Sequence, residues 1–145
     1  MPGGPGARRP VEDATWPAGL LAHGIALFNH GCYWEAHEAW ERLWQAAPRR
    51  SDESRMLQGL IALAAAGVKV RQGQAAGIAR HARRAAGFFA ELGGNAVAGF
   101  NRDALIAFAA AIATTPPRRA TGPAPEIVFA RPLPLPLESP PCPSN

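Results

Sequence analysis

Cysteine and lysine are scarce in this chain of 145 residues, which has two cysteines and only one lysine, Lys69. Cys32 and Cys142 form no C-x-x-C pair, so the sequence indicates neither a disulfide framework nor a zinc-finger spacing. All other cations are arginines, and the net charge of +4 is spread thinly along the chain. A nucleic-acid-binding surface would need these cations to gather on one face, so we do not expect nucleic acid as a partner.

Long apolar segments are also missing. The longest candidate, residues 60–68, has about half the length that a membrane-spanning helix requires. The first residues have no hydrophobic region behind Arg8 and Arg9, so we expect no signal peptide. The sequence therefore predicts a cytoplasmic protein that does not enter a membrane.

Proline is unevenly distributed. Ten of the 15 prolines lie from Pro116 onward and three precede Val11, whereas Pro48 alone interrupts the stretch between Pro17 and Thr115. Segments rich in proline and glycine bury too little apolar surface to offset the entropy lost on folding. We therefore predict a disordered segment at 1–12, a folded domain at 13–114, and a mostly disordered proline-rich tail at 115–145.

Apolar residues of the central segment recur with helical periodicity, and no credible alternating strand is present. Gly31 and Gly73 suit tight turns between helices, while Ser51 or Asp52, and Asn101, can cap the helices that follow them. The third helix is apolar nearly all round, so we expect it to be the buried central one. The predicted fold is all-α, a compact bundle of about five helices built from two helix-turn-helix hairpins plus a C-terminal helix. The predicted helices span about 17–30, 32–45, 52–72, 74–92 and 102–113.

The second predicted helix carries most of the chemistry. Three of the four tryptophans lie within residues 34–44, with three carboxylates and one histidine among them. At about 100° per residue, His37 lies beside the aromatic face and Glu41 follows one turn later. A buried imidazole needs a hydrogen-bond partner, and a neighbouring carboxylate can orient it as a ligand or a general base. Gln58, on the third helix, could complete a network with this pair.

Three interpretations of this network stay open. It can be a structural network that fixes the helix register, a pocket for a ligand, or a metal site. The metal site is the least supported, because di-metal bundles use Glu-x-x-His on each of two helices, and this sequence has no such pairs. The sequence also lacks a P-loop and a dinucleotide-binding glycine pattern. We therefore assign no metal and no cofactor, and we expect His23, His30 and His81 to face solvent.

Two segments resemble a known family, the domain of unknown function 309. Residues 27–44 read Leu-Phe-Asn-His-Gly-x-Tyr-Trp-Glu-x-His-Glu-x-Trp-Glu-x-x-Trp, and residues 58–64 read Gln-Gly-Leu-Ile-x-Leu-Ala. The resemblance covers about residues 18–92 and implies a compact all-helical fold with no established activity. The chain departs from the family at Ala62, where a polar residue is common. By resemblance, the motif positions are Asn29, Gly31, Glu35, His37, Glu38, Glu41, Trp44 and Gln58.

The sequence thus predicts an uncharacterised helical domain with a polar site between the second and third helices. This site would bind a small polar ligand or a protein partner. One alternative is an enzyme for hydrolysis or proton transfer, with His37 as the general base and Glu41 orienting it. Another is a helical scaffold in which the network is purely structural. The candidate site residues are His37, Glu41, Glu38, Glu35, Gln58 and Asn29, with Tyr33, Trp34 and Trp44 as walls.

Overall fold

The computed structural model describes residues 18–94, 96–97 and 100–117. It contains five helices, which confirms the predicted all-α class. The disordered segment predicted at 1–12 lies outside the described residues, as does the predicted tail beyond residue 117. The helices are α1 (Ala18–Asn29), α2 (Tyr33–Ala46), α3 (Asp52–Gln72), α4 (Ala75–Ala90) and α5 (Arg102–Thr114).

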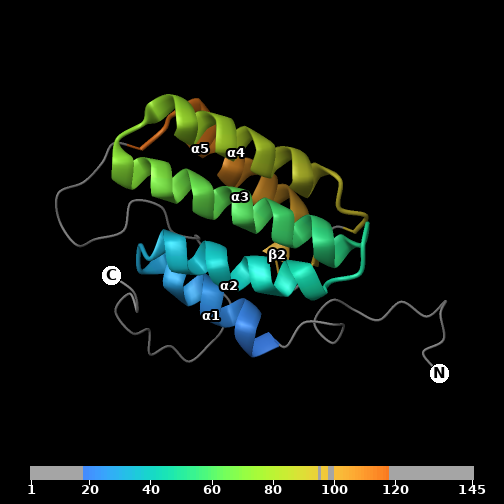
Figure 1. The fold of residues 1–145 in the computed structure, drawn as a ribbon. Coiled ribbons are helices and arrows are strands. Elements are labelled where there is room, and N and C mark those ends of the chain that lie inside the picture. Colours follow the sequence, from blue (N-terminus) through green and yellow to red (C-terminus); the bar gives the residue numbers. More distant parts are fainter. Residues whose placement is uncertain (1–17, 95, 98–99, 118–145) are drawn as a thin grey trace, which may run out of the picture.

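The helices are stacked in chain order around α3. Each packs mainly against its neighbours in the sequence, so that α1 and α2 lie on one side of α3 and α4 and α5 on the other (Figure 1). None of the helices in the described part of the chain combines the length and the apolar character that a membrane span requires. Because α3 lies in the middle of the stack, both of its sides are covered, as its apolar sequence predicted.

A short antiparallel pair connects α4 to α5, where no strand was expected. Strands β1 (Ala96–Val97) and β2 (Phe100–Asn101) pair through Ala96 with Asn101 and Val97 with Phe100. Two residues are too few to show an alternating pattern, so these strands could not be predicted from the sequence.

The predicted turns and caps are present. Gly31 and Gly73 have φ angles of +83° and +69°, in the left-handed region that glycine adopts without a steric penalty. The Ser51 hydroxyl accepts a hydrogen bond from the Ser54 amide at 3.0 Å, and the Asn101 side chain accepts one from the Ala104 amide at 2.9 Å. These local signals set the ends of α3 and the start of α5.

Glycine lets the helices approach closely at three interfaces. Gly24 of α1 faces the Trp40 indole of α2, and Gly67 of α3 faces the Tyr33 ring of α2. Gly59 of α3 faces the Phe89 ring of α4 in the same way. A Cβ atom at any of the three would overlap the ring, so these contacts fix how α1, α2, α3 and α4 sit against one another.

Candidate functional site

A groove runs between α2, α3 and α4 and has a volume of about 240 Å³. We call it the histidine groove. One stripe of residues from each helix lines it, with members three or four residues apart on α2 and α4 and the adjacent pair Ile61 and Ala62 within the stripe on α3. The stripes are His37, Glu41 and Trp44 on α2; Gln58, Ile61, Ala62 and Ala65 on α3; and His81, Arg84 and Phe88 on α4.

Helix periodicity places these stripes next to the core. The buried face of α2 consists of Tyr33, Ala36, Trp40 and Leu43, and the groove stripe follows it by about one residue. On α4 the order is reversed, because the groove stripe comes one residue before the buried Ala82, Ala85 and Phe89. Ala62 and Ala65 have small side chains, which leaves space above α3 between the side chains of α2 and α4.

His37 is held in place by its neighbours but keeps an unused polar atom. Its ring stacks on that of Trp34, with centroids 5.3 Å apart and an interplanar angle of 10°. Its Nδ1 atom lies 3.9 Å from the Glu41 carboxylate, which is too far for a hydrogen bond. That Nδ1 atom is buried and has no hydrogen-bond partner in the described structure.

His81 forms the opposite wall, where the sequence analysis had expected a solvent-facing side chain. Its Nδ1 atom is also buried without a hydrogen-bond partner in the described part of the chain. Burial lowers the pKa of His81 below 6.5, and the nearby charges of Arg80, Lys69, Arg84 and His37 lower it further. The imidazole is therefore largely neutral at pH 7 and has both a donor and an acceptor nitrogen.

The other predicted site residues lie outside the groove lining. Glu38 is exposed, and Glu35 and Asn29 are half-buried on other faces. Tyr33 is 2% exposed in the core against Gly67, so it is not a wall. Trp34 is 54% exposed and adjoins the groove through its stacking on His37.

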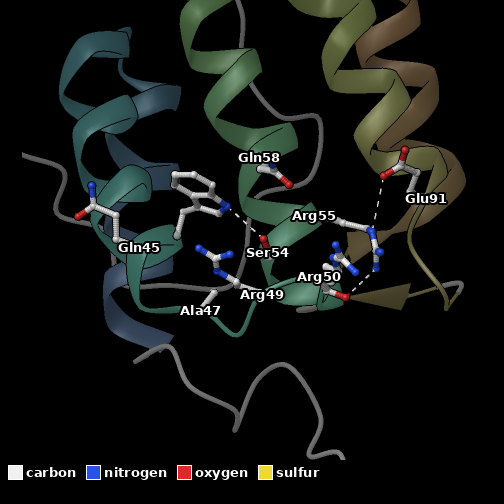
Figure 2. Close-up of a pocket in the computed structure, with 9 residues that line it drawn as sticks. Gln45, Ala47, Arg49, Arg50, Ser54, Arg55, Gln58 and Glu91 are labelled. Atoms are coloured by element: carbon white, nitrogen blue, oxygen red, sulfur yellow. Dashed lines mark hydrogen bonds and ion pairs between the residues drawn. The ribbon is translucent and has the colours of Figure 1, made fainter.

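A second, larger cavity of about 610 Å³ adjoins the first. We call it the arginine cleft. Its arginines come from the loop between α2 and α3 and from the first turn of α3 (Figure 2). No role was assigned to Arg49 and Arg50 from the sequence. The cleft is lined by Trp44, Gln45, Ala47, Arg49, Arg50, Ser54, Arg55, Gln58 and Glu91.

Neither cavity is built as a metal centre or around a reactive thiol. Within the described residues, no three His, Cys, Asp or Glu side chains are grouped so that they could hold a metal ion. Cys32 is 2% exposed and disulfide-bonded, which differs from the sequence expectation. Disulfide formation depends on the three-dimensional fold, which the position of a cysteine in the sequence does not report.

Fold and groove together define a small all-helical domain with a polar groove across three of its helices. Residues 21–81 match the family model described as "Domain of unknown function (DUF309)", which confirms the resemblance found in the sequence. The matched segment contains all of the groove lining except Arg84 and Phe88. No curated protein matches the chain.

Proposed function

We propose that the chain is a binding module whose histidine groove takes up a small polar ligand or a single polar side chain of a partner. One observation carries this proposal. The Nδ1 atoms of His37 and His81 are both buried and both lack a hydrogen-bond partner in the described structure, and the two side chains line the same groove. A buried polar atom without a partner costs about 1–3 kcal/mol, and a ligand that bonds to both imidazoles would recover this energy.

The size and lining of the groove favour a compact ligand of mixed character. Its volume of about 240 Å³ lies below the range typical of drug-sized pockets. Ile61, Ala62 and Phe88 supply apolar surface, while Gln58 can donate and accept hydrogen bonds. The lining therefore suits a molecule of about amino-acid size that has both an apolar part and hydrogen-bonding groups.

Binding is better supported than catalysis or a purely structural role. The groove lining contains no hydroxyl or thiol side chain that could act as a nucleophile. For His37 to act as a general base oriented by Glu41, their separation of 3.9 Å would have to shorten to hydrogen-bonding distance. A structural network would be expected to satisfy its own polar atoms, which the two imidazoles do not.

The four histidines of the chain provide the test with its own control. His37 and His81 line the groove, whereas His23 and His30 are exposed on α1 and in the turn after it. Side-chain NMR signals of all four would be followed in the full chain during titration with the twenty amino acids and a panel of short carboxylic acids and amides. We expect at least one compound to move the His37 and His81 signals together and to leave those of His23 and His30 in place.

Variants then connect the signals to affinity. His37→Phe and His81→Phe keep an aromatic ring but remove its hydrogen bonds, so each should weaken binding by about tenfold. His30→Phe is the matched control and should bind like the unchanged chain. The proposal fails if no compound moves His37 or His81, or if all four histidines respond alike.

A further inference from the structure

The arginine cleft carries positive charge that the described residues do not compensate. Arg55 is engaged, because it lies 3.8 Å from the Asp52 carboxylate and 3.6 Å from that of Glu91, and it donates to the Arg50 carbonyl at 3.1 Å. Arg49 and Arg50 are exposed, and their guanidinium groups form no ion pair within the described ranges. Two guanidinium groups among the residues that line the cleft therefore stay available (Figure 2).

The wall beside these arginines is rigid and aromatic. The Trp44 indole donates a hydrogen bond to the Ser54 hydroxyl at 3.1 Å, which fixes the ring while leaving the residue 37% exposed. Ser54 is held in turn through its amide, which donates to Ser51. Arginine binds carboxylate and phosphate through two parallel hydrogen bonds, and an indole face accepts a flat or apolar group.

The arginine cleft and the histidine groove adjoin each other and share part of their lining. Trp44 and Gln58 line both cavities, one from α2 and the other from α3. His37 and Trp44 are seven residues apart on α2, which corresponds to about 10 Å along the helix. A molecule that reaches from Arg49 to His37 must therefore be elongated and must pass over the Trp44 side chain.

We propose that the arginine cleft binds the oxyanion, a carboxylate or a phosphate, of a small molecule whose other end lies in the histidine groove. This inference rests on the proposed function and narrows its ligand to elongated organic anions. The two adjoining cavities with a shared lining favour a small molecule over a nucleic-acid backbone, which would need cations along an open surface. Trp44 and Gln58 are then the positioning residues at the middle of the ligand.

Four probes separate the parts of this proposal: 4-(4-hydroxyphenyl)butyrate, 4-(4-hydroxyphenyl)butyl phosphate, the neutral 4-(4-hydroxyphenyl)butanol and inorganic phosphate. The phenol of the three organic probes can donate and accept hydrogen bonds in the histidine groove. Binding to the full chain would be followed by NMR, through the Trp44 indole N–H and the side chains of His37 and His81. We expect at least one of the two organic anions to bind at least about tenfold more tightly than the alcohol and to move all three signals. The better of the two anions identifies the oxyanion as carboxylate or phosphate.

Variants assign the effect to the two free arginines. Arg49→Gln combined with Arg50→Gln should reduce the affinity for the anion to that for the alcohol, whereas Arg83→Gln, on the exposed face of α4, should leave it unchanged. Arg50→Gly gives a second test that keeps the fold, because Arg50 has a φ of +59° that glycine adopts readily. This variant should lose part of the anion affinity without a lower melting temperature.

The outcomes distinguish this inference from the proposed function. The arginine inference is wrong if the anions and the alcohol bind with equal affinity, or if the double glutamine variant binds the anion as tightly as the unchanged chain does. In either case the groove proposal stands as long as the alcohol still moves the His37 and His81 signals. Inorganic phosphate that binds as tightly as hydroxyphenylbutyl phosphate would also overturn the inference. So would a twelve-nucleotide single-stranded RNA that binds more tightly than both anions and loses affinity steeply with salt. If no probe or amino acid moves the histidine signals, the groove proposal fails too.

Discussion

Trp40 and Trp44 lie one turn apart on the same helix, yet their surroundings are opposite. Trp40 is fully buried against Gly24 and Phe28, and its indole donates to the Leu21 carbonyl at 3.4 Å. Trp44 is 37% exposed and lines both cavities. The aromatic residues of α2 thus have two kinds of surroundings. Some pack in the closed core, where shape complementarity determines their contacts, and others line the cavities, where they can contact a ligand.

The largest expected effect separates these two tryptophans. Trp40→Ala removes a fully buried side chain and should lower the free energy of unfolding by about 4 kcal/mol. Trp44→Ala removes one hydrogen bond and partly exposed surface, so it should cost only about 1 kcal/mol while weakening binding of the anionic probes. Chemical denaturation and probe titration measure the two quantities. Similar losses of stability for both variants would break the division between interior and groove.

Substitutions of glycine test the tight packing of the core with a smaller expected change in the free energy of unfolding. Gly67→Ala places a methyl group against the buried Tyr33 ring and should cost about 2 kcal/mol of unfolding free energy. Gly87→Ala is the matched control, since Gly87 lies within α4 and nothing is close to its added Cβ. This control should instead be stabilised by up to about 1 kcal/mol. A Gly67→Ala variant as stable as the unchanged chain would mean that the α2–α3 contact is not tight.

Much of the fold could be predicted because its signals are local. The helical periodicity, Gly31, Gly73 and Asn101 each act within a few residues, and the structure has helices, turns and a cap at these places. The pairing of Gly67 with Tyr33 involves residues more than thirty positions apart. Which ring meets which glycine depends on how the helices cross, so the sequence alone could not supply it.

The groove could be anticipated only on one side. His37 and Glu41 are neighbours because they lie four residues apart on one helix, which the sequence shows directly. His81 and Arg84 line the groove because α4 packs on the side of α3 opposite to α2, and no local pattern states this. That the His81 side chain lies against the groove could have been inferred from its position next to the buried stripe of Ile78, Ala82 and Ala85.

The smallest expected effect is on the pH dependence of the free energy of unfolding, and it tests only the groove, through His81. Because the pKa of His81 is lowered in the folded protein, the unfolded chain takes up this proton first as the pH falls. The free energy of unfolding should therefore be constant with respect to His81 above its ordinary pKa of 6.5 and should decrease below it. His81→Gln cannot titrate and should flatten this part of the curve between about pH 7 and pH 5.5, where few carboxylates titrate.

Denaturant unfolding at half-unit pH steps would measure this dependence, with His23→Gln as the control on an exposed histidine. The control should keep the slope of the unchanged chain. If the slope persists in His81→Gln, another group causes it, and His81 is as well solvated as the sequence analysis first supposed. If the slope disappears, the groove keeps a neutral imidazole at pH 7. A ligand that donates a hydrogen bond to that imidazole should then bind more weakly in acid, because protonation removes the accepting nitrogen.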